Sequence, residues 1–280
     1  MEAFIEILKA IFIGIVQGIT EWLPVSSTGH MIIANEFVKL KVSEGCWSLF
    51  EVITQLGSIL AVVILFFNKL NPFAKSKTNI EKKQTWTLWF KVIVAVLPAA
   101  VIGLIFEDFL DETFYKFVPV AIALIVYGIL FIVIERINKN KKMKYETVYD
   151  IDYPTALKIG CFQVLSLIPG TSRSGSTILG ASTIKVSRTA AAEFSFFLAI
   201  PVMLGASLLK VAKFLLDGFT LNSTEIIVLI TGTLTAFLVS LVVIKFLMAF
   251  VKRHSFESFG WYRIALGIIL VIYYIIKNIV

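Results

Sequence analysis

Two short polar segments interrupt apolar stretches of the sequence and carry residue types that could act on a phosphate. The first break runs from Gln17 to His30 and the second from Gln163 to Ser176. With a one-residue gap near the proline, both contain a glutamine, a hydroxyl residue, a proline, a hydroxyl cluster and a glycine in the same order. Hydroxyl, acidic and basic groups are costly in a lipid-like setting, so their presence there indicates function. Two breaks at matching places in two halves point to a membrane binding site.

Glu21 is the acid of the first break. Gln17 lies four residues earlier, so on a helix the two side chains share one face. A carboxylate there could hold a divalent cation, because hard cations prefer oxygen ligands, or it could act as a base. The alternative is a buried acid that pairs with a cation such as Arg173. We expect Glu21 to be functional.

Small residues follow the proline of the first break, in the order Ser26, Ser27, Thr28 and Gly29, and lead into a second helix. A helix N-terminus with free N–H groups and hydroxyls binds anions, phosphate above all. The same hydroxyls could serve only as an N-cap, and both roles can hold together.

His30 is one of two histidines in the chain, and the other, His254, lies in a basic loop. Because His30 follows Ser27 by about one helical turn, its ring can face the same pocket. Histidine titrates near neutral pH and suits proton transfer. The alternative is a packing histidine that forms hydrogen bonds.

Arg173 is the cation of the second break. Its planar guanidinium matches phosphate oxygens in a bidentate pair, and glycines on both sides allow the backbone to approach a ligand. A salt bridge to Glu21 or Glu193 is the alternative, and we favour the phosphate clamp. Three other polar groups inside apolar stretches are expected to support the structure: Glu51, Gln55 and Glu193.

The composition is that of an integral membrane protein. Of 280 residues, 58% are hydrophobic and 16% are charged, and the mean hydropathy is +0.88. The net charge of +7 comes from lysines clustered in short loops, as is typical of cytoplasmic loops. Nucleic-acid binding is not indicated, because the sequence has no basic face interleaved with aromatic residues.

The sequence indicates neither a disulfide nor a cleaved signal peptide. Cys46 and Cys161 are far apart in the sequence and imply neither a disulfide nor a metal site. Glu2 and Glu6 beside a single Lys9 differ from the positive start of a signal peptide, so we expect the first apolar stretch to remain in the mature protein.

Six apolar segments are long enough to span a bilayer, which takes about 20 residues. They cover residues 47–68, 86–106, 118–136, 190–212, 224–249 and 260–278. The break regions, 3–36 and 154–181, have arms that look short for a span. We expect each to be a re-entrant helix–loop–helix hairpin, because non-helical backbone at membrane depth must be buried in protein or line a wet cavity.

Loop charges predict one orientation. Cytoplasmic loops are rich in lysine and arginine, so the basic loops lie inside: 69–85, 137–153, 182–189 and 250–259. The outside then receives the acidic 107–117 loop, the 213–223 loop and the C-terminus. The first hairpin enters from outside and the second from the cytoplasm.

The chain is expected to be one all-α polytopic domain built from two repeats, about 1–140 and 150–280. Each repeat has one hairpin and three spans, and an odd span count inverts the second repeat in the membrane. Weaker matches outside the breaks are Ile13-Gly14 with Ile159-Gly160, and Glu51 with Glu193.

Both breaks resemble signatures of a known family. The segments QGITEWLPVSSTGH, from Gln17 to His30, and PGTSRSG, from Pro169 to Gly175, are similar to the paired motifs of the undecaprenyl-diphosphate phosphatase (bacitracin-resistance) family. The resemblance covers essentially the whole chain. It implies a bacterial plasma-membrane enzyme that removes the terminal phosphate of undecaprenyl diphosphate, giving the monophosphate carrier used in peptidoglycan synthesis. It also implies bacitracin resistance, a divalent cation (Mg²⁺ or Ca²⁺), inverted re-entrant repeats and a homodimer.

The resemblance assigns roles to individual positions. Catalytic roles fall on Glu21, Ser27, His30 and Arg173. Phosphate binding is predicted for Ser26, Thr28, Thr171, Ser172, Ser174 and Thr177. Many members have glutamate where Gln17 stands. Because glutamine cannot be a base, more of the acid role falls on Glu21, with Gln17 as a second candidate metal ligand.

The predicted reaction is hydrolysis of a phosphoanhydride where the two hairpin tips meet. Arg173, loop N–H groups and a cation on Glu21 would offset the charge of the diphosphate. The attacking group is either Ser27, activated by His30, or a water activated by His30 or Glu21 while Ser27 positions the phosphate. The polyprenyl tail would lie along apolar span faces in the bilayer.

A transporter or lipid flippase is the chief rival, since inverted repeats with broken helices are typical of transporters. In detergent a pure transporter would release no phosphate from a prenyl diphosphate. Acid-phosphatase-like lipid phosphatases need a second histidine downstream of their arginine motif, and His254 fits no such pattern. A soluble metal hydrolase would need His and Asp clusters. Loop charges do not say on which side the site opens; the resemblance suggests outside.

Overall fold

The computed structural model describes residues 2–114 and 117–279, and in these ranges the chain forms helices and no strand. The first half contains α1 (Glu2–Thr20), α2 (Ser27–Phe37), α3 (Glu44–Leu65), α4 (Phe67–Leu70), α5 (Asn79–Phe114) and α6 (Phe117–Asn138). The second half contains α7 (Tyr153–Val164), the 3₁₀ turn η1 (Leu165–Leu167), α8 (Arg173–Thr183), α9 (Arg188–Leu216), α10 (Ser223–Val251) and α11 (Glu257–Ile279).

The described chain contains seven helices that are long and apolar enough to cross a membrane: α1, α3, α5, α6, α9, α10 and α11. Six of them correspond to the predicted spans. The seventh is α1, which at 19 residues is longer than the short first arm that the sequence predicted. The all-helical prediction is confirmed, and the protein is a multi-pass membrane protein.

The predicted 107–117 loop is wrong over most of its length, because α5 continues as a helix to Phe114. The sequence from Phe106 to Phe114 contains neither glycine nor proline, so no breaker stops the helix there. Residues 115 and 116, and the acidic side chains on which that prediction rested, lie outside the described residues: Glu107, Asp108, Asp111 and Glu112.

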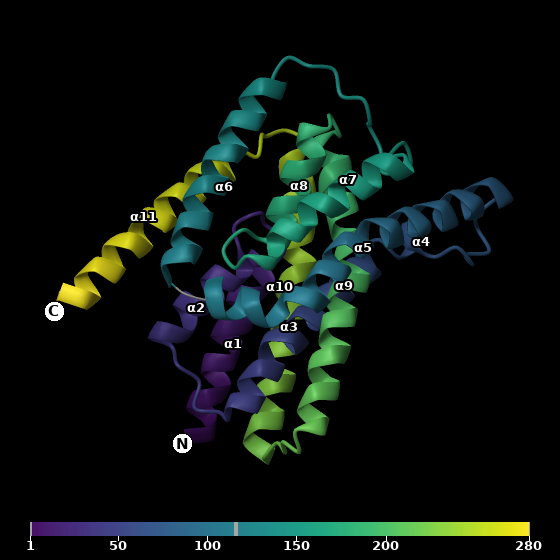
Figure 1. Cartoon of the computed structure of the whole chain (residues 1–280). Coiled ribbons are helices and arrows are strands. Elements are labelled where there is room, and N and C mark those ends of the chain that lie inside the picture. Colours follow the sequence, from purple (N-terminus) through teal and green to yellow (C-terminus); the bar gives the residue numbers. More distant parts are fainter. Residues whose placement is uncertain (1, 115–116, 280) are drawn as a thin grey trace.

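Each break is flanked by a helix that packs on a long helix from the other half of the chain. Figure 1 shows α1 along α10 and α7 beside α5. The close approach requires glycine: a Cβ on Gly14 would lie 2.6 Å from the Gly232 carbonyl oxygen, and one on Gly160 2.3 Å from that of Ala95. The matching Ile-Gly pairs of the two halves therefore mark equivalent packing positions.

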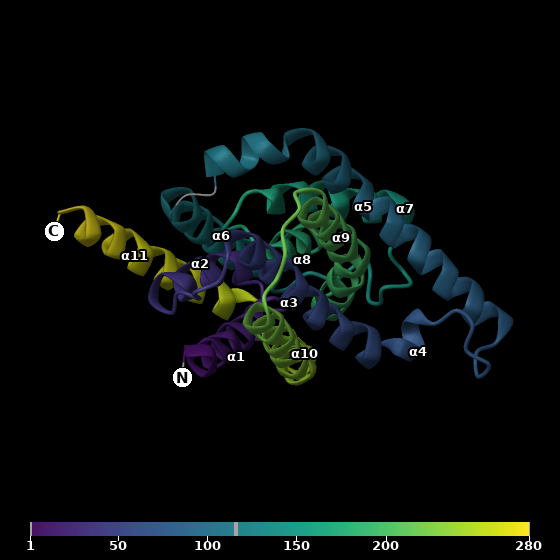
Figure 2. The ribbon, with the colours of Figure 1, turned by 90° about the horizontal axis from the view of Figure 1, so that it is seen from below.

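The molecule is built around the first half of α9. Its residues from Ala190 to Ala199 are all buried, including three phenylalanines. Figure 2 shows α8 and α9 between α5 on one flank and α6 with α11 on the other. Large apolar side chains on the outer helices remain exposed, as expected where lipid rather than water surrounds the protein.

Three of the predicted basic loops meet at one end of the molecule. Lys144 N donates to Lys185 O at 2.8 Å, which joins the 139–152 connection to the turn before α9. The buried Glu135 carboxylate accepts from Arg188 and from Phe256 N, so it ties the same turn to the connection between α10 and α11. These loops therefore share one side of the protein.

Candidate active site where the two breaks meet

Each break ends in a serine that has a positive φ and caps the following helix. Ser26 precedes α2 and Ser172 precedes α8; both have a positive φ, 74° and 73°, which is unfavourable for a residue with a side chain. Each serine hydroxyl accepts from the N–H of the glycine three residues later, at 3.2 Å for Gly29 and 3.1 Å for Gly175. Such strain is tolerated where surrounding structure fixes it and is often found at functional sites.

The two breaks are joined by an ion pair. Arg173 Nη2 donates to Glu21 Oε1 at 3.0 Å, and both side chains are almost fully buried. The other carboxylate oxygen, Oε2, accepts from Gln17 Nε2 at 3.0 Å, so the predicted shared helical face is confirmed. The salt bridge to Glu21, which the sequence analysis gave as the alternative to a phosphate clamp, is therefore present.

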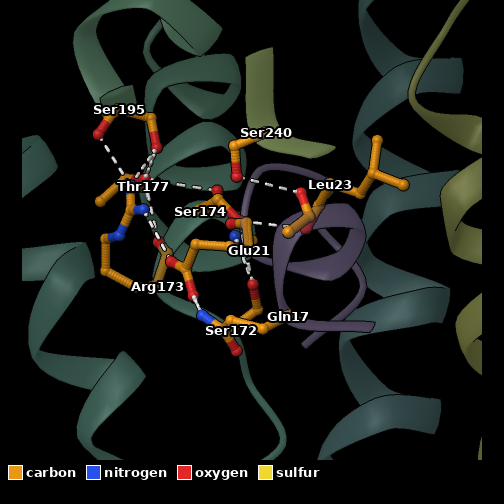
Figure 3. Close-up of polar contacts among 11 residues, drawn as sticks. Gln17, Glu21, Leu23, Ser172, Arg173, Ser174, Thr177, Ser195 and Ser240 are labelled. Carbon is orange, nitrogen blue, oxygen red and sulfur yellow. Dashed lines mark hydrogen bonds and ion pairs between the residues drawn. The ribbon is translucent and has the colours of Figure 1, made fainter. Parts of the chain in front are cut away.

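Arg173 is also anchored from behind by α9. Nη1 donates to the Ser195 carbonyl oxygen at 2.8 Å and contacts its hydroxyl at 3.2 Å, and that hydroxyl lies 2.7 Å from Thr177 Oγ1 (Figure 3). The guanidinium lies over the Trp22 ring, 5.7 Å from its centroid. Among the described residues the buried Nε–H has no hydrogen-bond partner, so Arg173 keeps one donor unused.

Ser174 adds a second link between the breaks. Its hydroxyl lies 3.3 Å from the Glu21 carbonyl oxygen and 3.2 Å from that of Leu23, where it donates, and 3.1 Å from the Ser172 hydroxyl (Figure 3). The start of α8 is thus fixed against the turn that follows α1.

A third link is made by Arg263 of α11, which the sequence analysis did not identify. Its fully buried guanidinium donates to Pro24 O at 3.0 Å and to Gly170 O at 2.8 Å, one carbonyl from each break. Within the described chain it forms no ion pair with an acid; the Tyr127 ring, 5.3 Å away, lies beneath it. An arginine near the start of a predicted span resembles an ordinary flanking cation, which is why sequence alone did not reveal it.

His30 lies at the edge of this cluster and, within the described chain, forms no hydrogen bond with Glu21 or Arg173. Its Nδ1 is 2.7 Å from the Ser26 carbonyl oxygen, and its Nε2 is 2.6 Å from the hydroxyl of Tyr262 on α11. Within the described chain no hydrogen bond joins His30 to Ser27, so activation of Ser27 by His30 stays a prediction.

The predicted phosphate-binding hydroxyls differ in availability. Thr171 donates to the carbonyl oxygens of Leu165 and Ile168, and Thr177 donates into its own helix, so both are used inside the second break. Among the described residues, the half-buried Ser27 and Thr28 have hydroxyls without a hydrogen-bonding partner. These two are the hydroxyls that a ligand could use without breaking an existing bond.

Glu193 supports the structure, as predicted, because it forms an ion pair with Lys69 at 2.7 Å. Arg173 pairs with Glu21 instead. The supporting roles predicted for Glu51 and Gln55 stay predictions.

A divalent cation would find few protein ligands here. No group of three or more His, Cys, Asp or Glu side chains that could hold a metal occurs in the described part of the chain. Glu21 is the one carboxylate of the site, and Arg173 and Gln17 engage its two oxygens. Mg²⁺ can be held by one carboxylate together with substrate phosphates, so the donor set fits only a cation that arrives with the diphosphate.

The comparisons with known proteins agree over nearly the whole chain. A family described as "Bacitracin resistance protein BacA" matches residues 10–269. A protein named "Undecaprenyl-diphosphatase" from Enterococcus faecalis (strain V583) is 58% identical over 272 residues, which cover 97% of this chain and 99% of the relative. One of the same name from Acetivibrio thermocellus is 56% identical over 271 residues, 97% of this chain and 98% of the relative.

Proposed function

Because the chain belongs to the bacitracin resistance protein BacA family, we propose that it hydrolyses undecaprenyl diphosphate to undecaprenyl phosphate and inorganic phosphate. This reaction recycles the lipid carrier for peptidoglycan synthesis and gives resistance to bacitracin. The observation that carries the proposal is the buried Glu21–Arg173 pair, which joins the two breaks beneath the first turns of α2 and α8.

The charge balance of the site favours an anion. Glu21 neutralises Arg173, whereas the buried Arg263 has no acid beside it. The first turns of α2 and α8 add partial positive charge from free N–H groups. A diphosphate supplies the missing negative charge. In the transition state, the same groups stabilise the charge that spreads over the transferred phosphoryl oxygens.

Arg173 meets the phosphate with its unpartnered Nε–H and adjusts its contact with Glu21 as the substrate enters. Ser195, itself held by Thr177, binds Nη1 on the opposite side and keeps the guanidinium plane in place. A lysine at this position would keep the charge but lose the planar geometry.

Ser27 is the hydroxyl that reaches the terminal phosphate, since it is half-buried and makes no other hydrogen bond in the described chain. It either attacks phosphorus, which gives a phosphoserine, or positions the phosphate for water. Rapid quenching during turnover separates the routes: labelled phosphate on Ser27 supports attack by serine, and clean absence supports attack by water.

The divalent cation remains a proposal. Mg²⁺ or Ca²⁺ bound to the diphosphate oxygens would use Glu21 as its acidic protein ligand, with the Gln17 carbonyl as a second, and would neutralise phosphate charge. Arg173 and the N-termini of α2 and α8 bind and orient the phosphates.

We infer further that the fold contains six spans and two re-entrant hairpins in an inverted repeat. Helices α2, α7 and α8 have 11 or 12 residues, well short of the roughly 20 that a bilayer needs. The equivalent glycine contacts of α1 and α7 support the repeat. The site would lie in the bacterial plasma membrane, with the basic loops inside and the C-terminus outside.

The test is phosphate release by the purified protein in detergent, with a prenyl diphosphate as substrate. Hydrolysis should be seen without any membrane compartment, and it should stop in the Arg173→Ala variant. A protein that only transports or flips lipid would release no phosphate. Such a result, from protein shown to be folded, would exclude the proposed reaction.

A further inference from the structure

We propose that Tyr262 passes the proton of the attacking hydroxyl to His30. The inference rests on the phosphatase function proposed above and adds a catalytic residue that lies outside both breaks, in the last helix of the chain. The two hydrogen bonds of the imidazole leave no free lone pair on His30.

The contacts of the ring define its tautomer. The Ser26 carbonyl oxygen, 2.7 Å from Nδ1, can only accept, so Nδ1 carries the proton. In the neutral ring Nε2 is then an acceptor, and the Tyr262 hydroxyl at 2.6 Å donates to it. The two rings are parallel within 5°, with centroids 5.7 Å apart, and the short bond between Nε2 and the hydroxyl joins them edge to edge.

This arrangement limits how His30 can serve as a base. Nε2 has one lone pair, and Tyr262 occupies it, so a proton reaches the imidazole through the Tyr262 oxygen. Tyr262 is about half exposed, so its side chain is not enclosed by the protein. Ser27, whose hydroxyl has no partner in the described chain, directly follows Ser26, whose carbonyl oxygen contacts the His30 ring.

The relay moves two protons as the phosphoryl group is transferred. The attacking hydroxyl, from Ser27 or water, gives its proton to Tyr262 Oη while the Tyr262 proton moves to His30 Nε2. The new O–P bond forms, and the bond between the terminal phosphorus and the bridging oxygen breaks. The electron pair stays on the bridging oxygen of the departing lipid phosphate, and the imidazolium later returns its proton to that product or to water.

The surroundings of His30 favour the neutral imidazole that this step requires. Burial of the ring disfavours its charged form, and Arg263, the neighbour of Tyr262 on α11, repels a proton there as well. The other charged groups on the packed elements are engaged elsewhere: Glu36 pairs with Lys277, and Glu6 with Lys9, at the ends of α2 and α1 away from the break. A phenol is a better donor than acceptor, so Tyr262 adds to the preference.

Tyr262→Phe removes the hydroxyl and keeps the aromatic ring. In detergent, with a prenyl diphosphate, we expect kcat to fall about 10- to 100-fold and KM to change less than about twofold. The acid limb of the residual pH–rate profile should move up by roughly half to one pH unit, because the imidazole loses a donor to its neutral form. In a His30→Ala background the same substitution should have no further effect.

Tyr273→Phe is the matched control. Tyr273 also lies on α11 and donates its hydroxyl to α2, at Glu36, but it does not contact His30. This variant should retain wild-type kcat and pH profile. A folded Tyr262→Phe protein with the kcat and acid limb of the wild type would overturn the relay, and so would a further loss of activity when Tyr262→Phe is added to His30→Ala.

Nitrogen NMR of the ligand-free protein tests the hydrogen bonds without turnover. The spectrum should show His30 neutral with the proton on Nδ1, and its Nε2 resonance should shift in Tyr262→Phe but not in Tyr273→Phe. A proton on Nε2 would contradict the proposal even in an active enzyme. If the tautomer is as expected and the wild type releases no phosphate, the proposed function fails and the relay with it.

Discussion

Arg173 combines two roles that sequence analysis treated as alternatives. Its Nη2 forms the salt bridge to Glu21, and its buried Nε–H has no partner among the described residues. The pair avoids a buried uncompensated charge at the junction of the two breaks. The salt bridge is therefore compatible with a phosphate clamp, because one donor of the guanidinium stays unused.

We predict that Arg173→Lys lowers turnover at least about 100-fold while the protein stays folded, because lysine keeps the charge but not the planar fork. Arg173→Ala should also lose about 3–5 kcal/mol of stability, since it leaves the Glu21 carboxylate buried and unpaired. Phosphate release and thermal unfolding in detergent measure the two effects. Arg136→Lys, at the exposed pair with Glu257, should change neither. Near-normal turnover of Arg173→Lys would remove the clamp.

Hydroxyl substitutions should separate ligand contacts from structural ones. We predict that Ser27→Ala abolishes or severely reduces turnover, because its hydroxyl is free for the phosphate. Thr171→Val should instead lower the unfolding temperature with little change in KM, because its hydroxyl is bonded to carbonyls of its own loop. Steady-state kinetics and thermal unfolding of both variants provide the check. A raised KM in Thr171→Val would restore the phosphate role that the motif predicts.

The residues of the two breaks could be identified from the sequence, but the residues that hold the breaks in place could not. Glu21 and Arg173 stand out because polar groups are rare in apolar stretches. Ser195 lies among alanines and phenylalanines with no distinctive pattern, and Arg263 and Tyr262 begin the last span, where such residues are common at membrane interfaces. Only the packing of α9 and α11 against the breaks reveals their contacts.

At the scale of elements, the turn before α8 depends on one glycine. Gly170 has φ +94°, and a Cβ there would lie 2.7 Å from the Val120 carbonyl oxygen on α6. Its own carbonyl accepts from Arg263. The backbone of the second break is therefore shaped by contacts from two helices, α6 and α11, that contribute no part of the break itself.

We predict that Gly170→Ala destabilises the protein by about 1–3 kcal/mol and lowers activity, because the new side chain is strained and displaces the loop from α6. Gly205→Ala in α9 is the control: nothing lies within 4 Å of its added Cβ, and alanine favours helix. Thermal unfolding should separate the two variants. Equal unfolding temperatures would mean that the turn tolerates a side chain.

Helix boundaries could be predicted where apolar runs end in charged or breaking residues, and not elsewhere. The spans that became α6 and α10 match their predicted ranges to within two residues. Helix α5 was expected to stop near residue 106, but acidic residues without glycine or proline do not end a helix, and it continues to Phe114. The first arm looked short because the polar break begins at Gln17, whereas α1 continues as a helix to Thr20.

At the scale of the whole molecule, three basic connections gather at one end of the protein. The basic connections 139–152, 184–187 and 252–256 lie together (Figure 1), and the connection between α9 and α10 lies at the opposite end. Because cytoplasmic loops are positive, the basic end should face the cytoplasm. The homodimer implied by the family resemblance stays a prediction.

The orientation can be tested by labelling single cysteines in intact cells, in a background with Cys46 and Cys161 replaced by serine. Lys141→Cys, in the basic loop, should react with an impermeant maleimide only after lysis. Thr220→Cys, an exposed position between α9 and α10, should react in intact cells. The reverse pattern would invert the proposed topology, and labelling of both sites in intact cells would contradict a sealed arrangement of these ends.

The central claim is that the two breaks together bind one diphosphate head group. The most direct measurement is an experimental structure of the protein with a non-hydrolysable prenyl methylene-diphosphonate. We predict that its terminal phosphonate lies between the Ser27 hydroxyl and the Arg173 guanidinium, with the lipid tail leaving along an apolar helix face. A diphosphonate that contacts only one break, with the Glu21–Arg173 region closed and empty of ligand, would contradict the account.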